Sequence, residues 1–249
     1  MGYRIFLAGA SGVIGRRLTP LLRDAGHHVT GTTRSAEKAA ALRALGAEPV
    51  VVDVFDAERL SREVASAKPD IVIHQLTDLP KGPDGAFLQG ALEGNARVRD
   101  EGTRNLVRAA LAAGAQRLIA QSIAWMYAPG PEPHAEEDPL DVDARGDRSI
   151  SVRGVVALET LALNSPPLSG TVLRYGHLYG PGTGSSGPPQ SAPLHVDAAA
   201  YAALLVVERP ATGVYNFAEP NGYVATGKAR TQLAWSSDLR LPASFRAGQ

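Results

Sequence analysis

The chain has 249 residues, of which 44% are hydrophobic, so it can bury one large core and still add a small lobe. Its 25 basic and 25 acidic residues balance, which disfavours nucleic acid and membrane surfaces as partners and favours a small molecule. The lack of cysteine excludes disulfide bonds and thiolate chemistry, and without a signal peptide or an apolar run of about 18 residues we expect a cytoplasmic protein that binds no membrane.

The first half of the chain alternates short apolar runs with segments of helical periodicity. Parallel βαβ units have this alternation, with helices of about a dozen residues between the strands. We therefore expect an α/β fold, a doubly wound parallel sheet with helices on both faces. The expected strands are 3–10, 27–34, 47–54, 69–76 and 115–122, and the expected helices are 15–26, 35–46, 56–67 and 102–114.

After Ser122 the alternation weakens. The proline-rich, acidic segment 128–140 predicts a solvated surface loop, and 182–193 has too many glycines, prolines and serines for regular structure. Between and after these loops we expect helices at 152–163 and 195–208, a strand running into a loop at 170–182, and a last strand at 213–217.

The segment "AGASGVIG", between the first strand and the first helix, is the strongest motif. Gly9, Gly12 and Gly15 have the spacing that allows a tight turn, a close approach of the backbone to a pyrophosphate, and close packing of helix on strand. The free N–H groups and positive dipole end of the helix would face the phosphates. This segment predicts a dinucleotide site.

The end of the second strand distinguishes the two nicotinamide dinucleotides. An acidic residue there would bind the adenosine ribose, whereas the segment "GTTRS" has Arg34, whose guanidinium can hold a 2′-phosphate. We therefore expect NADP(H) rather than NAD(H), although Arg34 could also be a solvated residue at a helix start. Asp53 and Val54 end the third strand where an adenine could rest, and Asp53 could equally cap the next helix.

These motifs, with "EGTRNLVRAA", "LRYGHLYGPG" and "HVDAAAYAALL", resemble those of extended or atypical short-chain dehydrogenase/reductases of the NAD-dependent epimerase/dehydratase family over nearly the whole chain. The resemblance implies a Rossmann domain, mainly 1–170, and a small substrate lobe, mainly 171–249, with parts returning to the Rossmann sheet. In the cleft between them a nicotinamide would meet a sugar-like or ketone substrate. The residues expected to bind the cofactor are Gly9, Ser11, Gly12, Val13, Ile14, Gly15, Arg34, Asp53, Val54, Gln75 and Leu76.

The acid-base pair of such enzymes is missing. The resemblance implies Tyr-x-x-x-Lys on the helix after the fifth strand, where the ammonium would lower the tyrosine pKa. Aligning Glu159 with a glutamate frequent in that helix puts Ser151 at the tyrosine position and Val155 at the lysine position. No tyrosine of the chain is followed by lysine four residues later.

Other side chains could take over the proton chemistry. Ser122 ends the fifth strand and could polarise a substrate oxygen, or merely cap the strand end. Tyr127, His177 and Tyr179 also fall at or after strand ends on the ligand side of the sheet. These four residues are the catalytic candidates, His74 could be a satisfied core histidine, and we expect no metal because the acidic loop lacks the histidine spacing of a metal site.

The connection between the late motifs is short, which predicts a reduced substrate lobe and a small apolar or aromatic substrate. Three functions stay open: an NADP(H)-dependent reductase or isomerase of a small ketone in specialised metabolism, a degenerate protein that binds the dinucleotide as a sensory or structural ligand, and a nucleotide-sugar epimerase or dehydratase. A homodimer could form through the helices at 101–114 and 151–163.

Overall fold

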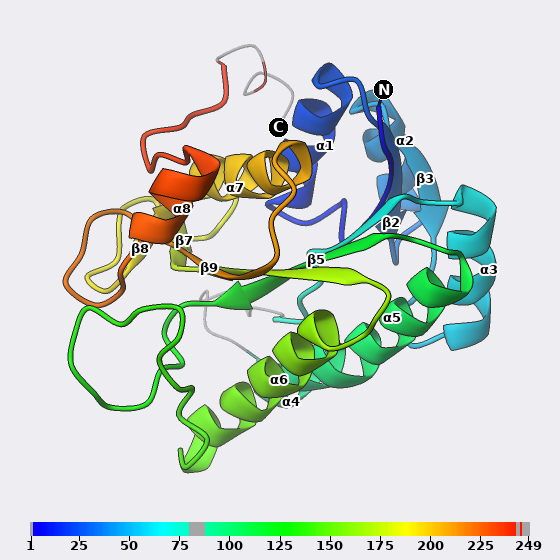
Figure 1. The fold of residues 1–249 in the computed structure, drawn as a ribbon. Helices are drawn as coiled ribbons and strands as arrows, with labels where there is room; N and C mark the ends of the chain where they lie inside the picture. Colours follow the sequence, from blue (N-terminus) through cyan, green and yellow to red (C-terminus); the bar gives the residue numbers. More distant parts are fainter. Residues whose placement is uncertain (1, 80–87, 243–244, 246–249) are drawn as a thin grey trace.

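The computed structural model describes residues 2–79, 88–242 and 245. In the described part of the chain a parallel sheet of seven strands forms the centre, in the order β3-β2-β1-β4-β5-β6-β9 (Figure 1). Because the order reverses between β1 and β4, the crevice for a ligand opens at the carboxyl ends of these two strands. The strands are β1 Arg4–Ala8, β2 His28–Thr33, β3 Glu48–Val51, β4 Ile71–His74, β5 Arg117–Ile123, β6 Ser169–Tyr175 and β9 Gly213–Phe217.

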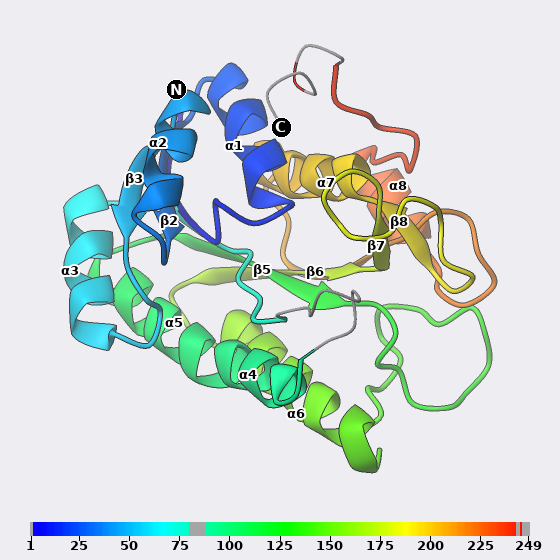
Figure 2. The same cartoon turned by 180° about the vertical axis from the view of Figure 1, so that it is seen from behind.

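Helices cover both faces of the sheet (Figures 1 and 2). One face carries α1 Gly15–Asp24, α2 Glu37–Ala44, α7 Val196–Glu208 and α8 Gly227–Leu233. The other carries α3 Ala57–Ala67, α4 Ala91–Arg97, α5 Thr103–Ala112 and α6 Gly146–Leu163. The predicted α/β fold with a doubly wound parallel sheet is confirmed.

The strands are buried on both sides because successive side chains point to opposite faces. In β1, Ile5 and Leu7 join the core under α1 and α7, while Phe6 and Ala8 join the core under α3 and α5. This two-sided burial accounts for the continuous apolar runs of the sequence, as is typical of parallel sheets.

The strand at 213–217 and the helix at 195–208 are present as β9 and α7. The structure adds α4, which continues through a π-helical turn, Val98–Gly102, into α5. It also adds the two-stranded sheet of β7 His177–Tyr179 and β8 Pro193–His195. We call this sheet together with α8 the small lobe.

The expectation of a solvated loop at 128–140 is wrong for two of its side chains. His134 and Glu136 are 3% and 8% exposed. The His134 ring stacks on Tyr127, and Glu136 accepts a hydrogen bond from the backbone N–H of Asn216 at 3.0 Å. The loop folds back on β9 because this strand offers a backbone donor that would otherwise be buried without a partner.

Candidate active site

A cavity of about 410 Å³ opens at the carboxyl ends of β1, β2, β3 and β4. It is lined by parts of the glycine-rich loop and by the residues that follow β2 and β3. The predicted cofactor residues that line it are Gly9, Ser11, Gly12, Arg34, Asp53, Val54, Gln75 and Leu76. Val13, Ile14 and Gly15 are not among the lining residues, and lead into α1 instead.

The glycines of the loop are required by close approaches of the backbone. Gly9 has a φ of +89°, and a Cβ there would lie 2.6 Å from the carbonyl oxygen of Gln75. At Gly15 a Cβ would lie 2.3 Å from the carbonyl oxygen of Gly9, so only glycine lets α1 begin this close to β1. No side chain caps the start of α1, so the positive end of its dipole is open to an anion, while the N–H groups of Arg16 and Arg17 donate to the carbonyl oxygens of Gly12 and Ile14. The loop therefore fits a pyrophosphate.

Basic side chains stand at the adenosine end of this cavity. Arg34 is exposed and its Nη2 donates to Asp78 Oδ1 at 3.1 Å, and Lys38 also lines the cavity. Asp53 accepts from the backbone N–H of Phe55 at 2.9 Å, whereas Asp56 caps α3. Sequence reasoning missed Lys38, which the helical spacing from Arg34 could have indicated.

At the other end of the site, α6 presents no acid-base pair. Ser151, at the expected tyrosine position, is half-buried, and Val155, at the expected lysine position, is buried. Val155 packs with Ile123, Met126 and Val152.

Ser122 belongs to a buried polar network rather than to an open surface. Its hydroxyl donates to Glu159 Oε1 at 2.6 Å, and Arg174 donates to both carboxylate oxygens of Glu159, at 2.9 and 2.6 Å. All three residues are buried. Sequence reasoning used Glu159 only as an alignment marker and missed Arg174, because residues 15 positions apart reveal no partnership in the sequence.

The Tyr127 hydroxyl extends this network. It donates to Asn216 Oδ1 at 2.7 Å and accepts from Arg174 Nη1 at 2.9 Å, and the residue is 2% exposed. Burial raises the pKa of Tyr127, and the charge of Arg174 together with the hydrogen bonds to Arg174 and Asn216 offsets only part of that rise. The hydroxyl is held on both its donor and its acceptor side.

Tyr179 and His177 lie on the lobe. The Tyr179 hydroxyl donates to Glu219 Oε1 at 2.6 Å, and burial together with this carboxylate raises the tyrosine pKa. The half-buried His177 ring stacks on Trp125, with ring centres 3.7 Å apart and planes 18° apart. Burial lowers the His177 pKa, so the ring is neutral at neutral pH. The catalytic roles of Ser122, Tyr127, His177 and Tyr179 stay predictions.

His74 is a satisfied core histidine in the structure. Its Nδ1 accepts from the backbone N–H of Leu76 at 3.2 Å, and its Nε2 lies 3.0 Å from Thr103 Oγ1. Burial, with the nearby charge of Arg99, lowers the His74 pKa to about 4. The side chain therefore ties the end of β4 to α5 as a neutral group.

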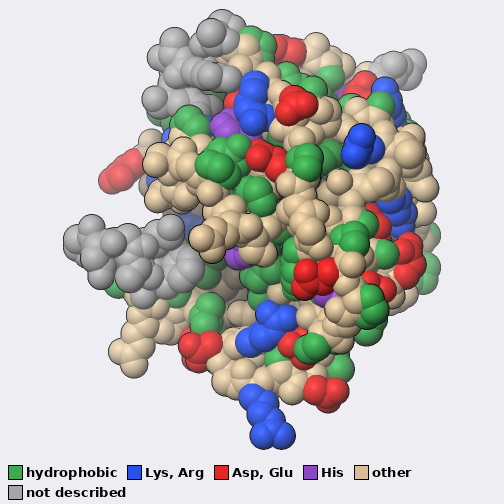
Figure 3. All heavy atoms as spheres, turned by 90° about the vertical axis from the view of Figure 1, so that its left-hand side faces the viewer, with side chains coloured by type: hydrophobic (Ala, Val, Ile, Leu, Met, Phe, Trp, Pro, Cys, Tyr) green, Lys and Arg blue, Asp and Glu red, His purple; other side chains and the backbone are tan. Residues whose placement is uncertain are grey.

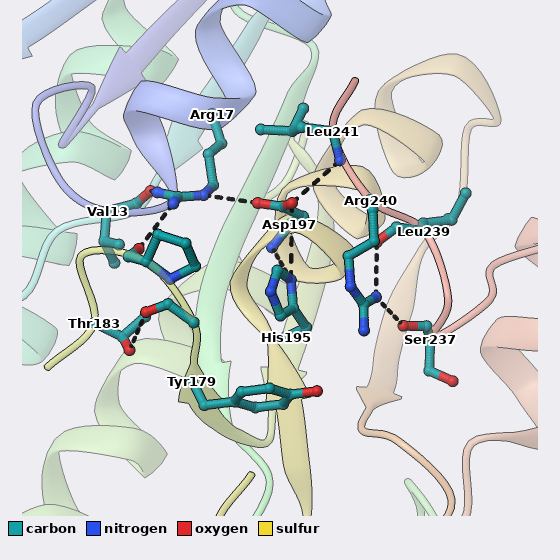
Figure 4. Close-up of polar contacts among 12 residues, drawn as sticks. Val13, Arg17, Tyr179, Thr183, His195, Asp197, Ser237, Leu239, Arg240 and Leu241 are labelled. Carbon is teal, nitrogen blue, oxygen red and sulfur yellow. Dashed lines mark hydrogen bonds and ion pairs between the residues drawn. The ribbon is translucent and has the colours of Figure 1, made fainter. Parts of the chain in front are cut away.

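Arg17 ties the glycine-rich loop to the small lobe (Figure 4). Its guanidinium donates to Asp197 Oδ1, to the carbonyl oxygen of Val13 and to that of Pro181, each at 2.8 Å. Asp197 lies in the first turn of α7, and its backbone N–H donates to the ring of His195, which caps that helix. One buried cation thus fixes the position of the loop relative to α7 and to the segment after β7.

Figure 3 shows the face on which the lobe lies, where acidic, basic and apolar side chains are intermixed and the coloured atoms form no extended field of one charge. Within residues 2–79, 88–242 and 245, no group of three or more histidine, aspartate or glutamate side chains could hold a metal ion. The helices of the described chain include none that is long and apolar enough to cross a membrane.

Comparison with known proteins places the chain in a family. The model of the NAD-dependent epimerase/dehydratase family matches residues 5–207. A Streptomyces protein named 3-diazoavenalumate denitrifying reductase is 44% identical over 235 residues, covering 84% of this chain and 74% of that protein.

The solved structures agree on the fold. The enzyme WbmG of Bordetella bronchiseptica, in complex with NAD, has a TM-score of 0.74 at 20% identity and covers 100% of this chain and 93% of its own. UDP-glucose 4-epimerase of Thermotoga maritima has a TM-score of 0.74 at 17% identity, with 95% and 94% coverage. The chain belongs to the NAD-dependent epimerase/dehydratase family, a dinucleotide-dependent family, and is a reductase-like member of it.

Proposed function

We propose that the protein is an NADP(H)-dependent reductase that delivers hydride to a small, conjugated electrophile which needs no proton from the enzyme. An aromatic diazo compound is the favoured substrate, and a small ketone is the second candidate. One observation carries the proposal. Ser151 and Val155 stand at the positions expected for the acid-base pair, while the hydroxyls of Tyr127 and Tyr179 donate to other side chains.

A ketone is a demanding substrate for such a site because its oxygen must receive a proton as hydride arrives. A positioned general acid is worth about 10²- to 10⁴-fold in rate, and it works best with a pKa near the working pH. The pKa values of Tyr127 and Tyr179 are instead raised, mainly by burial. Neither tyrosine is tuned for that task.

A diazonium group removes this demand. When bound, the reduced nicotinamide supplies a hydride, and the balance with an aryl diazonium ion is ArN₂⁺ + H⁻ → ArH + N₂. The carbon–nitrogen bond breaks, dinitrogen leaves, and no net proton is consumed. The protein then has to bind and orient the substrate and exclude water, which a site without an acid-base pair can do.

The 44% identical relative supports this choice, because its name describes a reductase that removes nitrogen from a diazo carboxylate. A diazo group persists in water mainly on a conjugated, aromatic framework. The stacked rings of Trp125 and His177 offer a flat surface for such a framework.

Arg34 and Lys38 support NADP(H) as the cofactor, because both line the cavity at the end of β2 where an adenosine 2′-phosphate would lie. The exposed guanidinium of Arg34 can leave Asp78 and bind a phosphate at little cost in free energy, because surface ion pairs stabilise a fold by only about 0 to 1 kcal/mol.

The test is turnover by the purified protein with NADPH and, as probe, the ¹⁵N-labelled diazonium prepared from 3-amino-4-hydroxybenzoate. We expect one labelled dinitrogen for each NADPH oxidised, above a reaction without protein, and a slower rate with NADPH deuterated at C4. Reduction of a ketone panel without reaction of the diazonium would select the ketone candidate instead. NADPH binding without any turnover would favour the sensory or structural alternative.

A further inference from the structure

Arg99 is a nearly buried cation that makes no hydrogen bond and no ion pair in the part of the chain that the structure describes. It lies in the π-helical turn between α4 and α5 and is 6% exposed. Its neighbours behave differently, since Arg97 pairs with Glu101 and Arg104 with Asp100 at the surface. Its guanidinium nitrogens are not among the buried side-chain atoms that lack a partner, so they keep some access to solvent and can reach a partner that the chain itself does not supply.

The side chain runs against α6 beside the expected lysine position. A Cβ at Gly154 would lie 3.4 Å from Arg99 Cδ and 2.9 Å from Ala96 Cα, so this glycine allows α4 and the π-helical turn to approach α6 closely. Val155 is the next residue of α6. The charge of Arg99 also acts on His74, at the carboxyl end of β4. Val98, the neighbour of Arg99 in the π-helical turn, lines the cavity at the ends of β1 to β4, so the turn that carries Arg99 reaches the site.

Glu159 does not satisfy Arg99. The negative charge of Glu159 raises the Arg99 pKa. Both carboxylate oxygens, however, already accept hydrogen bonds from Arg174, and one also accepts from Ser122. Glu159 thus pairs with Arg174 and acts on Arg99 only through its charge. Burial lowers the Arg99 pKa to about 10, which leaves the group cationic at neutral pH.

We propose that Arg99 binds an anionic oxygen of the substrate, a carboxylate or a phenolate, and thereby selects small aromatic acids. This inference rests on the proposed function, because it names the substrate class of the same site. The cation comes from the π-helical turn rather than from α6, where Val155 stands in the expected lysine position. With a diazo phenolate, the guanidinium draws negative charge onto the oxygen and so keeps the diazo group cationic and open to hydride.

Binding to the protein–NADP⁺ complex tests the inference without any reaction. The probes are 4-hydroxycinnamate, its methyl ester and cinnamate, titrated calorimetrically against the wild type, Arg99→Gln and Arg99→Lys. The matched control is Arg104→Gln, which removes an exposed arginine of the adjacent helix. Circular dichroism verifies that each variant is folded.

We expect the wild type to prefer 4-hydroxycinnamate over its ester by about tenfold or more if the carboxylate is bound, or over cinnamate if the phenolate is bound. Arg99→Gln should bring that ratio to about one. Arg99→Lys should keep part of the preference, and Arg104→Gln should keep all of it. The NADP⁺ dissociation constant should be the same in all four proteins.

Equal binding of the three probes by the wild type would overturn the inference, as would a preference that survives in Arg99→Gln. A loss of NADP⁺ affinity in Arg99→Gln, with the probe preference intact, would assign Arg99 to the cofactor instead. If the preference depends on Arg99 but the protein reduces neither the diazonium nor a ketone, the proposed function is contradicted and the role of Arg99 stands. If the protein reduces the diazonium without such a preference, only the role of Arg99 is contradicted.

Discussion

The guanidinium of Arg17 lies 2.8 Å from the carboxylate of Asp197, and the two side chains are 2% and 4% exposed. This ion pair joins the first helix of the sheet to α7, across 180 residues of sequence. The other hydrogen bonds of Arg17 satisfy carbonyl oxygens of Val13 and Pro181, so this residue links the glycine-rich loop to the segment after β7.

Replacing Arg17 with methionine should lower the free energy of unfolding by about 3 to 5 kcal/mol, because it breaks a buried ion pair. Urea unfolding followed by circular dichroism measures this. Arg59→Met, which breaks a surface pair with Glu63, should cost less than about 1 kcal/mol. Equal losses in the two variants would mean that the buried pair contributes nothing special.

The cofactor preference should depend on Arg34. Arg34→Asp should weaken NADPH binding by about ten- to a hundredfold through loss of charge-assisted hydrogen bonds, and should strengthen NADH binding, because an acidic residue at this point can bind the adenosine ribose. Fluorescence titration with both cofactors measures the ratio. Asp78→Asn is the opposite test, since it frees Arg34 from its 3.1 Å partner and should strengthen NADPH binding. A protein that prefers NADH before any substitution would contradict the assignment.

The sheet could be predicted from the sequence because its signal is local. Each strand is a short apolar run buried on both sides, and Gly9 and Gly15 mark the turn into α1 by their spacing alone. The loop at 128–140 could not be predicted in the same way. Its buried Glu136 is explained by a backbone donor 80 residues away, which no local pattern of charge reveals.

The same distinction divides the site. The cofactor end follows from a contiguous motif, and most of its predicted residues line one cavity. The buried polar network is built by Ser122, Glu159 and Arg174, which come from β5, α6 and β6. Arg99 was not a candidate because the sequence shows it as one of several charges on a helix, where arginine is usually solvated.

Trp125 should contribute to the binding of aromatic substrates. Trp125→Ala removes the ring that stacks on His177 at 3.7 Å, and should raise KM for an aromatic diazonium by about ten- to thirtyfold with a smaller effect on kcat. Trp125→Phe keeps a flat ring and should restore most of the affinity. Steady-state kinetics with NADPH at saturation measures both constants, and an unchanged KM in Trp125→Ala would remove the stacking surface from the site.

His74 should make the fold sensitive to mild acid. Its pKa is lowered from 6.5 to about 4 in the folded protein. Between pH 6.5 and pH 4 the histidine is therefore protonated in the unfolded chain but neutral in the folded protein. Stability is therefore unaffected above pH 6.5 and is lost as the pH falls toward 4, by about 2 kcal/mol between pH 7 and pH 5. His74→Gln, which has no titrating group but keeps a donor and an acceptor for Thr103 and Leu76, should lack this loss.

Urea unfolding at pH 7 and pH 5 measures the loss of stability, with the exposed His28→Gln as a control that should behave as the wild type does. If wild type and His74→Gln lost stability equally, the buried histidine would not be the group that refuses the proton.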